Sequence, residues 1–107
     1  MIYEITQRET SILKATITED GEVQDIRSDT VSIIIKKSKR DADADAVYAG
    51  SADVNTYGAT GIAYWALTPS DTDLTPGTYS FAIKRLHGTE EYYPLQGHIS
   101  VIHNLFD

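Results

Sequence analysis

Apolar residues recur mostly at every second position along this chain of 107 residues, which is the period of a half-buried β-strand. The runs 2–6, 11–18, 30–37, 61–68 and 92–101 follow this pattern, and the run 47–54 follows it weakly around Gly50. β-Branched and aromatic residues are frequent in these runs, as in strands generally. The pattern predicts an all-β fold of about seven antiparallel strands without a long helix.

The alternation also predicts which side chains face the core. Glycines and clusters of polar residues place turns at 19–22, 55–58 and 87–90, and a single helical turn is expected at 69–73. Gly97 inside the last strand predicts a bulge or the close approach of another backbone. The predicted core residues are Val31, Ile33, Ile35, Ala63, Trp65, Leu67, Tyr79, Phe81, Ile83, Leu95, Ile99 and Val101. In the run 11–18, Leu13, Ala15 and Ile17 share one face.

A turn of distinctive composition precedes the strand that contains Phe81. Leu74 and the pair Pro76-Gly77 come shortly before Tyr79, and period-2 alternation follows directly. Immunoglobulin-like (Ig-like) β-sandwiches enter a central strand in this way, with the tyrosine hydroxyl bonded to the backbone a few residues upstream. Together with strands spaced about ten residues apart, this turn predicts one Ig-like sandwich domain over 1–107.

Composition and charge exclude several classes of function. The net charge of −7 disfavours nucleic-acid binding, which needs a basic face to neutralise phosphates. The chain has no cysteine, so neither a disulfide framework nor a thiolate zinc site is available. It has no apolar run of membrane-spanning length and no leader-like start. We expect a protein that is made and kept in the cytoplasm.

No group of residues predicts a catalytic or metal site. Asp41, Asp43 and Asp45 have the spacing of the first ligands in an EF-hand loop, but the sixth and twelfth positions of that loop are Ala46 and Ala52. The three histidines lack metal-ligand spacing, and no nucleophile motif is present. We therefore expect no enzyme activity and no cofactor, and we interpret 41–46 as an exposed connection.

Two features are candidates for an interface with other molecules. Tyr64 alternates with the core positions of its run and is the aromatic residue most suited to a surface contact. The basic run of Lys36, Lys37, Lys39 and Arg40 directly precedes the acidic segment 41–45. In a homo-oligomer, the basic run of one subunit could meet the acidic segment of the next. Both features are equally consistent with ordinary solvated surface.

Several motifs together resemble a known family. They are the alternating run after Arg8-Glu9-Thr10, the strand ending in Lys36-Lys37, the segment Trp65-Ala66-Leu67-Thr68, the turn 73–79, and 95–101 with the pattern Leu-x-Gly-x-Ile-x-Val. Across nearly its whole length the chain is similar to the Ig-like amino-terminal domain of phage baseplate upper proteins and related small phage tail proteins. This resemblance implies a non-catalytic scaffold that docks into a virion tail or baseplate.

The resulting prediction is a structural or adaptor protein of a phage or prophage tail that acts through contacts with other virion proteins and with itself. It would be made in the cytoplasm of a bacterial host and end in the virion. Trp65, Leu74, Pro76, Gly77, Tyr79 and Gly97 are expected to have structural roles. The alternative is a carbohydrate- or cell-surface-binding Ig-like module, which requires exposed aromatic side chains grouped on one face or loop tip.

Overall fold

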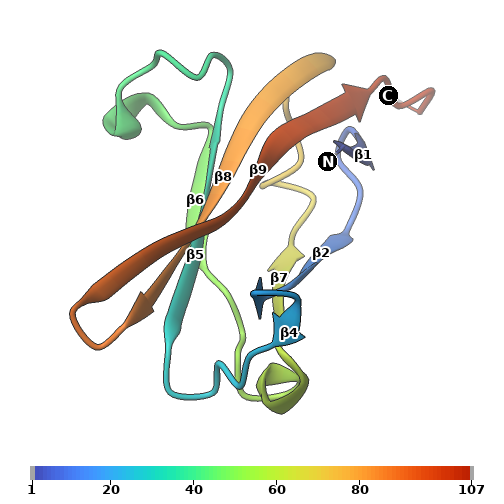
Figure 1. Ribbon diagram of the computed structural model, residues 1–107. Coiled ribbons are helices and arrows are strands. Elements are labelled where there is room, and N and C mark those ends of the chain that lie inside the picture. Colours follow the sequence, from blue (N-terminus) through green and yellow to red (C-terminus); the bar gives the residue numbers. More distant parts are fainter. Residues whose placement is uncertain (1, 107) are drawn as a thin grey trace.

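A computed structural model describes residues 2–106 as a twisted sandwich of β-strands (Figure 1). The two short 3-10 helices are η1 (Asp43–Asp45) and η2 (Gly58–Thr60). The strands are β1 (Ile2–Thr6), β2 (Ser11–Thr16), β3 (Thr18–Glu19), β4 (Glu22–Val23), β5 (Thr30–Lys36), β6 (Tyr48–Ser51), β7 (Ile62–Leu67), β8 (Gly77–His87) and β9 (Glu90–Ile102). The predicted all-β sandwich is confirmed.

The two layers of the sandwich differ in size. The larger sheet has five strands in the order β1-β9-β8-β5-β6, and the smaller one pairs β2 with β7. Strands β3 and β4 form a separate small hairpin whose turn contains Asp20 and Gly21, both with positive φ. All pairs are antiparallel except β1, which runs parallel to β9. That parallel pair is the one departure from the predicted antiparallel pattern, and it brings the two ends of the chain close together (Figure 1).

The core lies between the two sheets and is built from the predicted alternation. β5, β8 and β9 contribute one face and β2 and β7 the other, so that Ile33, Ile83 and Trp65 are each at most 2% exposed. Of the predicted core residues, only Leu95 is partly exposed rather than buried. Trp65 also donates a hydrogen bond of 3.0 Å from its indole nitrogen to the carbonyl of Gly50. This bond ties the smaller sheet to the edge strand β6.

The turn before β8 has the predicted tyrosine bond. Tyr79 is buried, and its hydroxyl donates a 2.6 Å hydrogen bond to the carbonyl oxygen of Thr75, four residues upstream. Leu74 packs against the core, while Gly77 has a φ of 152°, which side-chain-bearing residues rarely adopt. The turn therefore closes this end of the sandwich.

The expected bulge lies in β9, but not at Gly97. Gly97 pairs in regular register with Phe81, whereas the register shifts between the partners of Ile83 and Arg85. At this shift, Tyr93 and Pro94 on β9 lie opposite the single residue Lys84 on β8. Proline lacks an amide hydrogen and is tolerated inside a sheet only at such irregular positions. Of the two alternatives predicted for Gly97, the bulge is thus wrong, because the irregularity in β9 lies at Pro94 instead.

Gly97 instead allows two aromatic rings to approach each other. β9 lies between β1 and β8, and the rings of Tyr3 on β1 and Phe81 on β8 have centroids 5.3 Å apart. Since Gly97 pairs with Phe81 and carries no side chain, nothing on β9 separates the two rings at this level. The glycine therefore serves side-chain packing rather than backbone curvature.

Candidate functional site

The outer face of the larger sheet carries a surface pocket of about 560 Å³. We call it the outer pocket, and its lining residues are Ile34, Lys36, Lys39, Ser80, Phe81, Ala82, Gln96, Gly97 and His98. On β8 the outward lining residues are the small Ser80 and Ala82, which lie opposite His98 and Gln96 of β9. The pocket thus combines small side chains on its central strand with lysine, glutamine and histidine side chains around them.

Two of the four predicted basic interface residues line the outer pocket. Lys36 is mostly buried and its ammonium group donates to the carbonyl of Asp41 at 2.9 Å and to the carboxylate of Asp43 at 2.6 Å. These contacts lower the pKa of Asp43 below its ordinary value, with the hydrogen bond from Lys36 as the largest cause. Lys39 forms no ion pair within residues 2–106, so its charge is available to another molecule.

The remaining predicted interface residues lie elsewhere. Lys37 and Arg40 are exposed but do not line the outer pocket. Tyr64 lies on β7 in the smaller sheet and is half-buried, with its ring 5.8 Å from that of Tyr57. The structure therefore brings Lys36 and Lys39 together and separates them from Tyr64 by the thickness of the sandwich.

The acidic segment has a structural use. Asp41 accepts a 3.1 Å hydrogen bond from the backbone amide of Ser38, and Asp43 is the partner of Lys36. In the part of the chain that the structure describes, no group of three or more histidine and carboxylate residues lies close enough to hold a metal ion. Over the same residues, no helix is long and apolar enough to cross a membrane.

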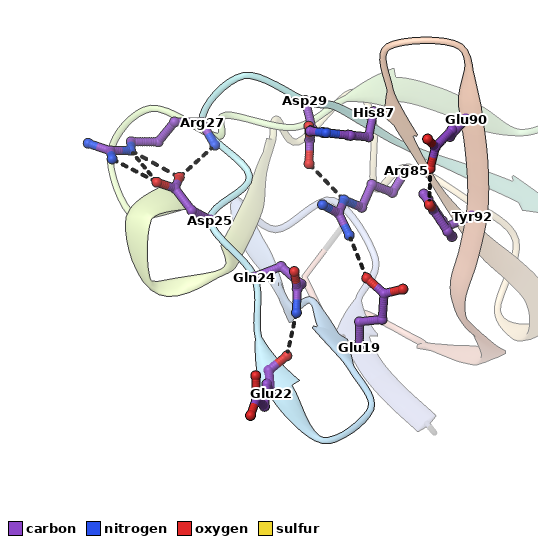
Figure 2. Close-up of polar contacts among 10 residues, drawn as sticks. All are labelled: Glu19, Glu22, Gln24, Asp25, Arg27, Asp29, Arg85, His87, Glu90 and Tyr92. Carbon is purple, nitrogen blue, oxygen red and sulfur yellow. Dashed lines mark hydrogen bonds and ion pairs between the residues drawn. The ribbon is translucent and has the colours of Figure 1, made fainter.

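The sequence reading missed a group of charged residues at the other end of β8. We call it the Arg85 cluster; it comprises Asp29, Arg85 and His87 with Glu19 at its margin (Figure 2). The Asp29 side chain is fully buried, and Arg85 Nε donates to its carboxylate at 2.7 Å. His87 Nδ1 lies 2.6 Å from the other carboxylate oxygen. Since an ionised carboxylate only accepts hydrogen bonds, this ring nitrogen carries the proton.

These contacts determine the charge state of Asp29. Burial raises the pKa of its carboxyl, but the hydrogen bonds from His87 and Arg85 outweigh burial and leave the pKa below its ordinary value. By contrast, Asp25 and Arg27 form an exposed pair in the same view, where hydrogen bonds from Arg27 lower the pKa of Asp25 to about 2 (Figure 2). The buried Asp29 is thus a stable anion that holds β8 to the segment before β5.

A second pocket, of about 190 Å³, opens beside the Arg85 cluster. We call it the Arg85 pocket; its lining residues are Ile17, Thr18, Glu19, Arg85, Tyr92, Tyr93 and Pro94. The bulge in β9 shapes one wall, since it displaces Tyr93 and Pro94 from regular pairing. The hairpin of β3 and β4 supplies Glu19, whose carboxylate points toward the Arg85 guanidinium (Figure 2).

Comparisons with known proteins bear on the fold of this chain. No family model matches the sequence, and no curated protein does. Among solved structures, the chain is similar to the N-terminal domain of ORF48 of phage TP901-1, with a TM-score of 0.55 and 12% identity. The similarity covers 94% of this chain and 84% of that domain's chain. At this level of identity the comparison shows a shared fold.

Proposed function

We propose that this chain is a non-enzymatic structural or adaptor protein of a phage tail or baseplate. It is made in the cytoplasm of the bacterial host and incorporated into the virion, where it acts through protein contacts. The observation that carries the proposal is the shared fold with a domain of a phage protein over 94% of this chain. The turn at 74–79 and the pattern at 95–101, which resemble those of baseplate upper proteins, support it independently.

The outer pocket is the contact surface that best fits this role. Its lining combines the apolar side chain of Ile34 with the cation of Lys39, which has no ion-pair partner within residues 2–106. Such a surface suits an acidic segment of another virion protein that also carries an apolar side chain. The pocket lies on the outer side of the sheet, so a partner can bind there without disturbing the core.

Replacement of single lysines tests this contact. In the phage or prophage that encodes the chain, Lys39→Glu places a negative charge in the outer pocket and is expected to reduce incorporation of the protein into particles by at least about tenfold. Lys14→Glu makes the same change in charge on an exposed residue of β2, outside both the pocket and the basic run, and should leave incorporation intact. Equal incorporation of both variants would contradict the assignment of the pocket.

Self-association is a second part of the proposal. Because Lys36 is engaged by Asp43 of its own chain, the basic residues left for a neighbouring subunit are Lys37, Lys39 and Arg40. Light scattering in low salt should report an oligomer that dissociates when these three residues are replaced by serine. Unchanged mass of the triple variant would show that the basic run does not mediate assembly.

A further inference from the structure

The segment after β9 exposes two large apolar side chains that are adjacent in sequence. Leu105 is 91% exposed and Phe106 is 83% exposed, the highest values for large apolar residues in the part of the chain that the structure describes. A single apolar residue on the surface is ordinary. Two adjacent ones that are almost fully exposed indicate a surface that another molecule covers.

Hydrogen bonds hold the backbone of this segment in place. The side chain of Asn104 donates to the carbonyl of Gln7 at 2.9 Å and accepts from the amide of Phe106 at 2.9 Å. The guanidinium of Arg8 donates to the carbonyl of Phe106 at 2.5 Å. The turn after β1 therefore fixes the segment, and less conformational entropy is lost when a partner covers Leu105 and Phe106.

The same bonds keep the segment away from the outer pocket of its own chain. Figure 1 shows the segment after β9 and the loop between β5 and β6, which carries Lys39, on opposite sides of the molecule. Neither Leu105 nor Phe106 lines the outer pocket. Since their own chain leaves both side chains exposed, a partner that covers them must be a second molecule.

The outer pocket has a surface that is complementary to such a segment. Its volume of about 560 Å³ lies in the range of pockets that enclose a ligand, and the small side chains of Ser80 and Ala82 leave room above β8. Ile34 adds an apolar side chain. Lys39 adds a cation that has no ion-pair partner within residues 2–106. The pocket therefore suits an apolar side chain with a carboxylate close to it.

Segment 104–107 combines these two groups. Phe106 supplies the exposed apolar side chain, and Asp107 follows it in the sequence. Consecutive Cα atoms are only about 3.8 Å apart, so the sequence itself places a carboxylate near the aromatic ring. When the ring lies above Ala82, this carboxylate can reach Lys39 on the rim of the pocket. The attraction between the opposite charges favours this orientation.

From these observations we propose that segment 104–107 of one copy of this chain occupies the outer pocket of a neighbouring copy. The proposal rests on the docking role of the outer pocket and names its partner. Each copy contributes two different surfaces, so successive contacts of this kind build a ring or an open chain. One short segment buries less surface than a stable interface needs, so a single contact is weak and gains strength by repetition.

Nuclear magnetic resonance of mixed variants of the intact chain tests the contact. Phe106→Ser keeps the pocket and loses the apolar side chain, whereas Lys39→Glu keeps the segment and loses the cation. Unlabelled Lys39→Glu is added to isotope-labelled Phe106→Ser up to about 1 mM, which covers weak binding. We expect saturable shifts of the amides of Ser80 and Ala82. With the labels exchanged, the shifts should appear at 104–106. Absence of shifts, or shifts of the same residues in both experiments, would overturn the proposal.

A second substitution in the unlabelled chain identifies the side chain responsible. Unlabelled Lys39→Glu that also carries Phe106→Ser should bind at least about tenfold more weakly, because one large apolar side chain is no longer buried. Ile12→Ser in place of Phe106→Ser is the matched control, because Ile12 is also exposed, at 57%, and does not line the pocket. It should leave the affinity unchanged. Equal affinity of the two double variants would contradict the assignment.

Incorporation into particles separates this contact from the docking role. If Lys39→Glu is lost from particles but the mixed variants show no shifts, the outer pocket binds a different virion protein, and only the contact between copies is wrong. If the shifts appear as expected but particles lack the protein, the contact between copies stands and the role in the tail is wrong.

Discussion

The hydroxyl of Tyr79 is one of the few polar atoms in the core, and its bond to Thr75 fixes the turn that leads into β8. Removing the hydroxyl leaves the Thr75 carbonyl without this donor but retains the buried ring. Tyr79→Phe should lower the free energy of unfolding by about 1 kcal/mol, the usual net value of one hydrogen bond.

Urea denaturation followed by fluorescence of Trp65 measures this change. Tyr93→Phe is the matched control, because the Tyr93 hydroxyl is bonded only to the exposed Glu91, at 3.2 Å. It should change stability by no more than a few tenths of a kcal/mol. A Tyr79→Phe variant as stable as this control would show that the turn does not depend on the bond.

Asp29 links stability to pH. The pKa of its carboxyl in the folded protein lies below the ordinary value near 4. The folded state therefore binds this proton less readily, and the stability contributed by the Arg85 cluster is complete above about pH 4. It is lost as the pH falls through the lower, folded-state pKa. Asp29→Asn should cost about 3 kcal/mol at neutral pH, because Arg85 is left buried without its anion.

The pH dependence of urea unfolding between about pH 2 and pH 7 separates this effect from general acid denaturation. Asp29→Asn should flatten the acid limb of the stability curve. Asp45→Asn, at an exposed residue outside any ion pair in the described chain, should leave the limb unchanged. An acid limb of wild-type steepness in Asp29→Asn would show that another group controls it.

At the level of single residues, the sequence indicates that Arg85 is buried but does not identify the carboxylate that it contacts. Arg85 occupies the inward parity of β8, two positions beyond Ile83, and a buried cation requires a carboxylate partner. Nothing local identifies that partner, since Asp29 is one of sixteen acidic residues and contacts Arg85 across 56 positions of sequence. The sequence could therefore predict that Arg85 has a carboxylate partner, but not that this partner is Asp29.

At the level of elements, hydrophobic alternation predicts the inward-facing residues of a strand that buries one face. The apolar inward residues of β5, β7 and β8 were predicted correctly because burial of one face imposes period 2. The sequence did not predict the register of β9 against β8, because this register depends on the position of Pro94. The parallel pairing of β1 was also hidden, because alternation does not encode the direction of a neighbouring strand.

The contact between Tyr3 and Phe81 gives a prediction for β9. Valine is a better strand former than glycine, but at Gly97 its side chain would enter the space between the two rings. Gly97→Val should therefore destabilise the protein by about 2 kcal/mol, as overpacked cores do. Ser100→Val tests strand preference alone, because Ser100 faces outward on the same strand.

Thermal unfolding of the two variants should place Gly97→Val below the wild type and Ser100→Val at or above it. If Gly97→Val were as stable as Ser100→Val, the glycine would have no role in ring packing. A drop in both variants would point to the backbone of β9 rather than to the space beside Phe81.

At the level of the whole molecule, the charge distribution is less simple than the sequence suggests. The basic run and the acidic segment are neighbours in sequence, and one pair between them, Lys36 with Asp43, closes within the chain. Lys39 projects its charge instead to the outer pocket, on the sheet opposite Tyr64. The candidate contact residues predicted from sequence thus fall on two different faces, which linear spacing does not reveal.

We have proposed that this protein is a component of a phage tail. Immunogold electron microscopy of particles released by cells that carry the gene, with an antibody raised against the chain, tests it most directly. We expect gold label at the end of the tail and the intact chain in purified particles. Particles that assemble normally and lack the chain, with the protein remaining in the cell lysate, would contradict the claim.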